Sequence, residues 1–300
     1  MHTFLKKPLI LLALFFSASL FATTYDLPTP PNTLVGQVQQ IKARSNTVTD
    51  IDKKYDVGYT EMVEANPNLT MDVLSYGQMV TVPTQFILPD TPHKDIVVNI
   101  AEMRLYYYPA DQKQVMTFPI GIGKEGRYTP IGKTDVVLKA ENPEWNPTPQ
   151  VRDDFLKLNG YPLPKLVMPG PDNPLGQYSM ILGIPTYLIH GSIDPSGIGR
   201  RSSAGCIRMF NEDIGSFFSM VVPKQTQVTL IYEPYKAGWS GDTLYLEAHA
   251  PITIDYPHTP DYKVVIKNAL KQRPNVKTNV DWEKAAETVK LALGVPQPIG

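Results

Sequence analysis

Alternating apolar and polar positions run through the middle of the chain and predict a series of strands. The segments that carry this pattern, with turn residues between them, are 95–100, 104–108, 115–120, 134–140, 186–191 and 227–233. Only 211–221 has helical spacing there, with Asn211 as its expected N-cap. Strands that follow one another without intervening helices favour a mainly β domain of sandwich or barrel-like type. We place this domain at residues 94–232.

A smaller unit precedes it. The predicted order is strand, helix, helix and strand, over 34–43, 49–57, 59–67 and 77–88. This pattern predicts a small β-α-α-β domain over residues 34–84, followed by a proline-containing linker to residue 94. Residues 23–33 hold three prolines and few apolar side chains, which is typical of a flexible leader.

The last part of the chain, residues 233–300, is predicted to be an extension that ends in a helix. It begins with a hairpin-like segment at 238–249 and continues through an irregular stretch to a helix at 281–293. One face of that helix carries the apolar residues Trp282, Ala286, Val289 and Leu293. We expect this face to pack against the β domain.

The first 22 residues have the pattern of a secretory signal peptide. Two lysines precede an apolar run at 8–16, and small residues continue to Ala22, with cleavage expected after Ser19 or Ala22. The apolar run is shorter than a membrane-spanning helix requires, so an uncleaved signal anchor is the less favoured alternative. Residues 1–22 therefore predict an exported protein.

Composition narrows the possible functions. The 28 basic and 29 acidic side chains give a net charge of −1, which does not favour nucleic acid as a partner. The single cysteine, Cys206, excludes an internal disulfide, a cysteine-based zinc site and an iron–sulfur cluster. A free thiol in an oxidising compartment is either a buried packing residue or a nucleophile.

A cysteine nucleophile needs a base and amide groups that face the oxyanion. His190 ends an apolar strand and opens a glycine-bearing turn, which makes it the best candidate base. Gly205 lets backbone amides approach the reacting carbonyl beside Cys206. Positive charge that would favour the thiolate comes from three nearby arginines, Arg200, Arg201 and Arg208.

The segment that contains these residues, IHGSIDPSGIGRRSSAGCIRMFNEDI at 189–214, resembles the active-site segment of YkuD-type L,D-transpeptidases. Further similarity lies in YTPIGKT at 128–134, ENPEWNPTPQVR at 141–152 and PLPKLVMPGPDNPLG at 162–176. Many family members have histidine at the position of Ala204. We expect activity to survive this difference, because the essential base of the motif is the upstream histidine.

The resemblance implies roles for the motif residues. Cys206 would attack the carbonyl of the third, diaminoacid residue of a peptidoglycan tetrapeptide stem and expel the terminal D-alanine. His190 would be the base, oriented by the carbonyl of Gly191, and amides near Gly205 and Cys206 would form the oxyanion hole. Arg208 would position the donor stem.

Other residues are weaker candidates for substrate binding. Ser203 would help to position the donor stem, and Trp145 and Tyr187 would form walls of the cleft. The resemblance calls for no metal or cofactor. Four scattered histidines in residues 23–300 also lack the spacing of metal ligands, which disfavours a metal-dependent wall hydrolase.

The segments YTEMVEANPNL at 59–69 and GQMVTVP at 77–83 resemble a LysM module, a small domain that binds glycans containing N-acetylglucosamine. Such modules usually carry Gly-Asp-Thr before the first helix, whereas RSNTVTDI stands here at 44–51. The 34–84 domain is therefore either a glycan-binding module or a spacer of the same shape.

The resemblance places the protein in the periplasm, with peptidoglycan stem peptides as partners. The sequence leaves the identity of the acceptor amine open. An amine of a second stem would give a 3→3 cross-link. A lysine on an outer-membrane protein or lipoprotein, the acceptor that we favour, would tether that protein to the wall. Transfer to water would make the enzyme a carboxypeptidase. The alternative from another class is a non-catalytic wall-binding protein.

Overall fold

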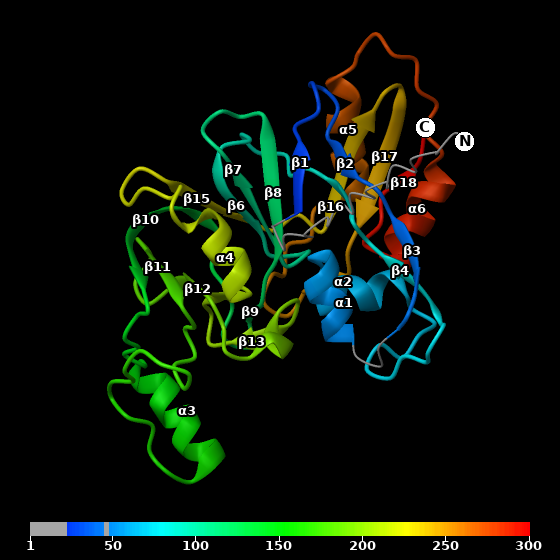
Figure 1. Ribbon diagram of the computed structural model, residues 1–300. Helices are drawn as coiled ribbons and strands as arrows, with labels where there is room; N and C mark the ends of the chain where they lie inside the picture. Colours follow the sequence, from blue (N-terminus) through cyan, green and yellow to red (C-terminus); the bar gives the residue numbers. More distant parts are fainter. Residues whose placement is uncertain (1–22, 45–47) are drawn as a thin grey trace, which may run out of the picture.

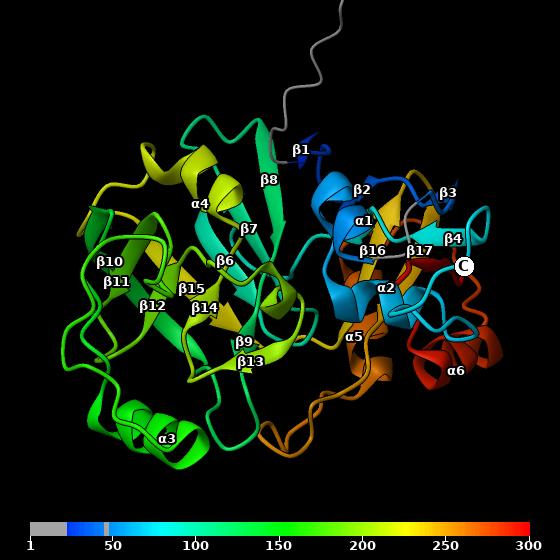
Figure 2. The same cartoon turned by 60° about the horizontal axis from the view of Figure 1, so that its bottom comes forward.

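The computed structural model describes residues 23–44 and 48–300 (Figures 1 and 2). The predicted signal peptide, residues 1–22, lies outside the described residues. More of the described chain forms strands than helices, which confirms the predicted mainly β fold class.

A nine-stranded sheet forms the centre of the molecule, with the strand order β1-β8-β7-β6-β15-β10-β11-β12-β14. In chain order its strands are β1 Thr23–Asp26, β6 Asp95–Asn99, β7 Arg104–Tyr108, β8 Gln114–Pro119, β10 Gly132–Glu141, β11 Tyr178–Leu182, β12 Leu188–His190, β14 Ile207–Arg208 and β15 Gln227–Ile231. A separate short pair joins β9 Ile122–Gly123 to β13 Arg201–Ser203. Each of the six predicted strand segments contains an observed strand.

Strand β10 bends the sheet. Its first half, 132–135, pairs with β15, and its second half, from Val136 on, pairs with β11 (Figure 2). Helix α4, Asn211–Phe218, covers the core side, where Phe217 stacks on Tyr107 at a centroid distance of 5.1 Å. The other side of β6 and β7 packs against the N-terminal domain, so these strands are buried on both faces.

The N-terminal domain has the predicted strand–helix–helix–strand order, with each predicted strand divided in two. Its elements are β2 Leu34–Gly36, β3 Gln39–Lys42, α1 Val48–Tyr55, α2 Tyr59–Ala65, β4 Met79–Val82 and β5 Gln85–Ile87. Strand β2 pairs with β5 and β3 with β4. The break follows Gly36, which has φ 75° and whose added β-carbon would meet the Thr84 carbonyl oxygen at 2.1 Å.

The C-terminal extension contains the predicted hairpin, β16 Tyr235–Ser240 and β17 Thr243–Ala248, joined by β18 Gln297–Pro298. Its helices are α5 Tyr262–Lys271 and α6 Trp282–Leu291. Helix α6 packs on β17 and not on the nine-stranded sheet, and it buries Ala285 and Thr288 while Trp282 is exposed. The predicted neighbour of α6 was therefore wrong, and the predicted face was right only in part, because Val289 packs in the apolar cluster of the extension while Trp282 and Ala286 are exposed.

Two further expectations are corrected, and one helix lies where none was predicted. The 23–33 segment is not a flexible leader, because β1 pairs with β8 at the edge of the central sheet. The proline-rich stretch 141–174, in which no helix was predicted, contains helix α3, Pro149–Asn159, capped by Thr148. The stretch expected to be irregular after the hairpin contains α5, which Asp261 caps.

Candidate active site

A cleft of about 690 Å³ opens beside β12 and β14. Six of the predicted site residues line it: Trp145, Tyr187, His190, Ser203, Cys206 and Arg208. Gly191 and Gly205 are chain neighbours of this lining. The structure thus brings residues from 145 to 208 together in one concave site.

The geometry of His190 follows from its place at the end of β12. Strands β12 and β14 are parallel, and His190 lies opposite Arg208 in the register. The His190 Nδ1 is 2.6 Å from the Gly191 carbonyl oxygen. A carbonyl can only accept, so Nδ1 carries the proton and Nε2 keeps the basic lone pair. Burial lowers the pKa of His190 to about 4, so the imidazole is neutral near pH 7.

Cys206 lies in the turn between β13 and β14 and is partly exposed. Its Sγ is 3.6 Å from the carbonyl oxygen of Thr186. Burial raises the pKa of the thiol, and a hydrogen bond at the Leu188 backbone and the charge of Arg208 act in the opposite direction. Because burial is the largest cause, the resting cysteine is a protonated thiol.

The expectation that three arginines surround the thiol is wrong for two of them. Arg200 lies over the Tyr59 ring at 3.1 Å and is 3.6 Å from Asp72, in the N-terminal domain. Arg201 forms an ion pair with Asp255. Arg200 and Arg201 therefore pair with acidic side chains away from Cys206, although both are close to it in the sequence.

Arg208 is the arginine of the three that lines the cleft. Its Nη1 is 3.4 Å from the Ser202 hydroxyl, and its buried Nε has no hydrogen-bond partner among the described residues. A guanidinium with uncommitted donors in a cleft is suited to bind a carboxylate.

Ser203 shapes the turn that presents the thiol. Its hydroxyl donates to the Cys206 carbonyl oxygen at 2.5 Å and accepts the Gly205 amide at 3.0 Å. Both bonds lie within the turn, so the hydroxyl is engaged by the protein and not held free for the donor stem. The Gly205 amide is engaged as well. The Cys206 amide has no acceptor among the described residues and is therefore available as an oxyanion donor.

Gly205 is required by close packing. Its φ is 117°, and an added β-carbon would lie 2.9 Å from a ring carbon of Tyr187. The Thr129 hydroxyl donates to the Gly205 carbonyl oxygen at 2.8 Å, and the Tyr187 hydroxyl donates to the Tyr128 carbonyl oxygen at 3.3 Å. The 124–129 loop and Tyr187 thus clamp the turn from two sides.

Trp145 also lines the cleft, on a segment fixed by two backbone hydrogen bonds of 2.9 Å to Val167. Helix α3 follows this segment and is tied to the 124–129 loop by an ion pair of 2.7 Å between Arg127 and Asp154. Figure 2 shows α3 at the outer edge of the molecule. Together these elements form a flap along one side of the cleft.

Sequence reasoning missed the positioning role of Asn211. It begins α4, but the N-cap is Phe210 and not Asn211 as expected. The Asn211 side chain instead donates to the Ser192 carbonyl oxygen and accepts the Gln177 amide, both at 3.0 Å. These contacts hold the loop after His190. Both partners are far from Asn211 in the sequence, so no local sequence pattern predicts them.

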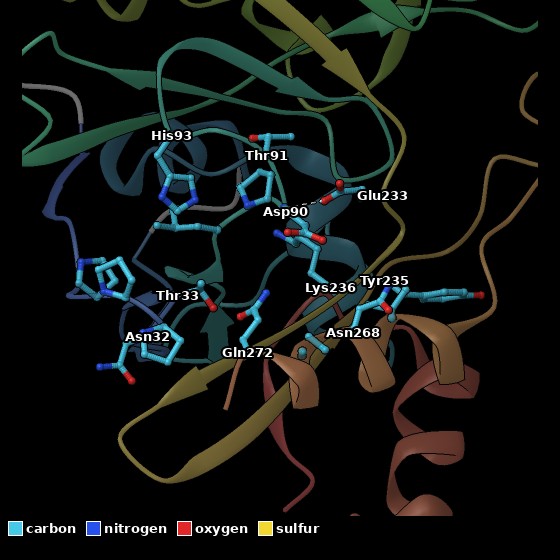
Figure 3. Close-up of a pocket in the computed structure, with 18 of the residues that line it drawn as sticks. Asn32, Thr33, Asp90, Thr91, His93, Glu233, Tyr235, Lys236, Asn268 and Gln272 are labelled. Carbon is cyan, nitrogen blue, oxygen red and sulfur yellow. Dashed lines mark hydrogen bonds between the residues drawn. The ribbon is translucent and has the colours of Figure 1, made fainter. Parts of the chain in front are cut away.

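A second cleft, of about 470 Å³, lies between residues 28–33, the linker and α5 (Figure 3). None of the predicted site residues lines it. The Asp90 amide donates to Glu233 at 3.2 Å across one end of it (Figure 3). Burial raises the pKa of Glu233 to about 7. This cleft contains no nucleophile–base pair.

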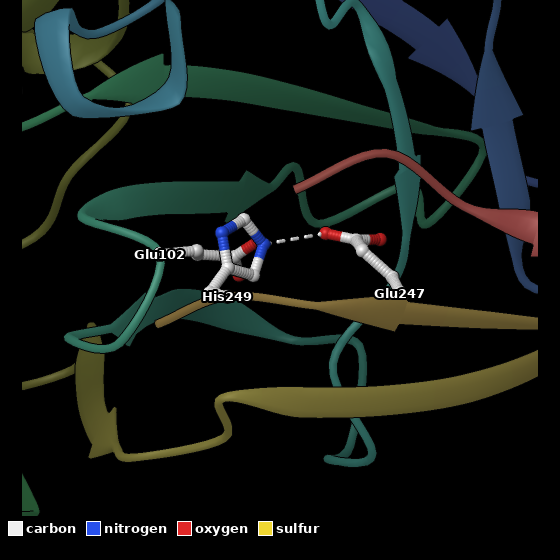
Figure 4. Close-up of side chains that lie close together, drawn as sticks. All are labelled: Glu102, Glu247 and His249. Atoms are coloured by element: carbon white, nitrogen blue, oxygen red, sulfur yellow. Dashed lines mark hydrogen bonds and ion pairs between the residues drawn. The ribbon is translucent and has the colours of Figure 1, made fainter. Parts of the chain in front are cut away.

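Glu102, Glu247 and His249 lie close enough to share a metal ion (Figure 4). However, the Lys236 ammonium lies 2.5 Å from Glu102 and 2.8 Å from Glu247, where it takes the place that a metal ion would need. The ring of His249 contacts Glu247 and Glu64, each at 2.9 Å. These contacts form a buried ion-pair cluster in which side chains of the protein already engage the carboxylate oxygens.

Within residues 23–44 and 48–300, no helix has both the length and the apolar content needed to cross a bilayer.

Comparison with known proteins shows the family of the chain. The family model of the L,D-transpeptidase catalytic domain, YkuD, matches residues 93–230. The NMR structure of the catalytic domain from the Enterococcus faecium L,D-transpeptidase aligns with 48% of this chain and 100% of that chain, at 26% identity and a TM-score of 0.36. The chain is 38% identical over 288 residues to the probable L,D-transpeptidase YbiS of Escherichia coli K12, covering 94% of this chain and 93% of that protein. It is 39% identical over 296 residues to the probable L,D-transpeptidase ErfK/SrfK of the same strain, covering 95% and 94%. The chain belongs to the L,D-transpeptidase family.

Proposed function

We propose that this chain is an exported, periplasmic enzyme in which Cys206 forms a thioester with a peptidoglycan tetrapeptide stem and transfers the acyl group to an amine. The observation that carries the proposal is the shared cleft of Cys206, His190 and Arg208, with the His190 Nδ1 proton held by the Gly191 carbonyl. This arrangement leaves a base, a thiol and a carboxylate-binding cation on one surface.

Acylation starts from two neutral groups. As Cys206 Sγ attacks the carbonyl carbon of the diaminoacid residue, the thiol proton passes to His190 Nε2, and the Cys206 amide donates to the oxyanion. Collapse of the tetrahedral intermediate breaks the peptide bond to D-alanine. The leaving amine takes the proton from the imidazolium, which burial makes a ready acid, and a thioester remains.

Deacylation repeats these roles with an amine as nucleophile. The acceptor nitrogen attacks the thioester carbonyl and gives a proton to His190, and the Cys206 thiolate leaves and is reprotonated. We favour a lysine of an outer-membrane protein or lipoprotein as acceptor, following the resemblance of the 34–84 domain to the LysM-bearing branch of the family, which is similar to enzymes that tether proteins to the wall. A stem amine would give a 3→3 cross-link, and water would give a carboxypeptidase.

Arg208 links substrate binding to the base. Its charge contributes to the lowered pKa of His190, although burial contributes more. A donor-stem carboxylate bound by Arg208 would offset this charge and make His190 more basic when the substrate is present.

The test is incubation of the purified protein with tetrapeptide-containing muropeptides, with and without a lysine-bearing peptide. We expect release of D-alanine and appearance of a peptide-linked product that requires the lysine. D-alanine release with product only on stems would leave the transpeptidase and exclude the tethering acceptor. Correctly folded protein that releases no D-alanine would favour the non-catalytic wall-binding alternative.

A further inference from the structure

Two acidic side chains lie where β1, the N-terminal domain and α4 meet. Asp56 follows α1 and is buried, and Asp213 lies in the first turn of α4. Asp56 Oδ1 and Asp213 Oδ2 are buried and have no hydrogen-bond partner among the described residues. The two carboxyl groups lie close enough to hydrogen-bond to each other when one of them is protonated, but a buried carboxylate oxygen without a permanent donor is costly.

The acidic side chains at the interface outnumber the nearby cation. Burial raises the pKa of Asp56 to about 6, and burial together with the nearby Asp56 raises the pKa of Asp213 well above its usual range. The nearby cation, Arg104, makes two 2.7 Å bonds to Glu61 and donates to the Asp56 backbone carbonyl at 3.0 Å. One guanidinium therefore lies near three acidic side chains, Glu61, Asp56 and Asp213. It makes its two shortest hydrogen bonds to Glu61.

The nitrogen of Thr23 lies at this position. It donates to Asp56 Oδ2 at 2.9 Å, and Thr23 is the first residue of β1. Thr23 is also the first residue after Ala22, one of the two cleavage positions that the signal-peptide pattern predicts. Hydrolysis of the Ala22–Thr23 bond consumes one water and converts this amide nitrogen, which has one hydrogen, into an ammonium with three.

We propose that cleavage between Ala22 and Thr23 creates a partly buried N-terminal ammonium that ion-pairs with Asp56, beside Asp213, and completes the interface between the N-terminal and catalytic domains. The inference rests on the proposed export of the chain. Among the two cleavage positions the geometry favours Ala22, because cleavage after Ser19 leaves three residues ahead of Thr23 and no charge at its nitrogen.

The new charge lies close to a structural link with the active site. Asp56 is two residues before Gly58, where α2 begins against the Gly199 backbone; an added β-carbon at Gly58 would lie 2.8 Å from the Gly199 α-carbon. The Thr60 amide and hydroxyl both donate to the Gly199 carbonyl oxygen, at 3.0 and 2.6 Å. Processing therefore stabilises the docking of α2 on the loop that leads to Cys206.

The test compares chains of residues 23–300 with defined N-termini, one with a free amine on Thr23, one acetylated there and one extended by Ala22. We expect the free-amine form to melt about 3 °C or more above both others. Its α-amino pKa, measured by NMR on labelled Thr23, should lie at least about one unit above the ordinary value of about 7.7–8.0. Equal melting temperatures together with an ordinary α-amino pKa would overturn the ion pair.

Matched variants locate the partner. Asp56→Asn should remove the difference between free and acetylated forms, whereas Asp26→Asn, at the exposed end of the same strand, should keep it. N-terminal sequencing of the exported protein checks the processing site, and a mature terminus other than Thr23 would overturn it. Muropeptide assays on the same samples report on the proposed transpeptidase separately, so the two failures are distinguishable.

Discussion

The catalytic pair is neutral at rest, because burial acts in opposite directions on the two side chains. It raises the pKa of the Cys206 thiol and lowers that of His190. The proton therefore moves during the attack on substrate, and a thiolate–imidazolium pair is not present beforehand. This conclusion differs from the expectation of an arginine-stabilised thiolate, since Arg200 and Arg201 bind acids elsewhere.

Alkylation of the thiol tests this charge state. The rate of labelling by iodoacetamide should be low near neutral pH and rise to a midpoint above about 8.5, the pKa of a free cysteine. Arg208→Gln should move the midpoint higher, because it removes the cation that lowers the thiol pKa, and Arg200→Gln should not. A wild-type midpoint below pH 7 would show a preformed thiolate.

Replacement of the base has a larger effect on turnover. His190→Ala should reduce D-alanine release by roughly 10²–10⁴-fold, the usual contribution of a general base. A matched His258→Ala change, at an exposed position, should leave the rate unchanged. Near wild-type turnover of His190→Ala would mean that another group accepts the thiol proton.

At the scale of elements, the N-terminal domain holds the loop that leads to the active site. Thr60 binds Gly199 twice, and the 2.6 Å bond from its hydroxyl is the one a side-chain change can remove. Ser202 then connects this loop to Arg208 through its contacts with the Gly197 carbonyl and the guanidinium. A defect in α2 is therefore transmitted to the residue that we assign to donor binding.

Thr60→Val tests this connection. Loss of a hydrogen bond worth about 1 kcal/mol should lower kcat/KM for the muropeptide several-fold, mainly through KM. The pH midpoint of Cys206 alkylation should stay unchanged. Thr70→Val, at an exposed site of the same domain, is the control. Equal kcat/KM values for the two variants would contradict a positioning role of α2.

The predictable elements are those with a clear local pattern. Alternation located six of the nine strands of the central sheet and both strands of the hairpin. Helix α3 was missed because it buries no residue, so no apolar stripe marks it among the prolines. Strand β1 was missed because its four residues are stabilised by pairing with β8, a contact across about ninety positions that local patterns do not report.

The residues of the candidate site divide in the same way, into those that a local sequence pattern reveals and those that only the folded structure brings together. The motif from Ser203 to Arg208 is contiguous, so sequence alone could locate its residues, although the hydrogen bonds of Ser203 were not predictable. The contacts of Asn211 and Thr129 join distant segments and carry no local signal. The engagement of Gly205 by Ser203 also depends on the shape of the turn.

At the scale of the whole molecule, a buried ion-pair cluster joins the three parts of the chain. Glu64 comes from the N-terminal domain, Glu102 from the central sheet, and Lys236, Glu247 and His249 from the C-terminal extension. Separating any one part would leave buried charges unpaired, which costs about 3–5 kcal/mol when one partner of a buried pair is removed. The C-terminal extension is therefore held as an integral part of the fold.

The cluster predicts a pH dependence of stability. Its carboxylates raise the pKa of His249 from 6.5 to about 10, although burial acts against them. A raised pKa stabilises the fold fully below about pH 6.5, and the stabilisation is lost as the pH rises through 10. The melting temperature of His249→Gln should thus differ most from wild type at pH 6 and least above pH 10, with His258→Gln as control. A difference that does not change with pH would contradict a protonated His249.

The central claim is that Cys206 carries the acyl group of the donor stem. Intact-protein mass spectrometry after incubation with tetrapeptide muropeptides measures this directly. We predict an adduct with the mass of the stem less D-alanine, located on Cys206, absent from Cys206→Ala, and discharged when a lysine-bearing peptide is added. Release of D-alanine by Cys206→Ala, or an adduct on any other residue, would contradict the account.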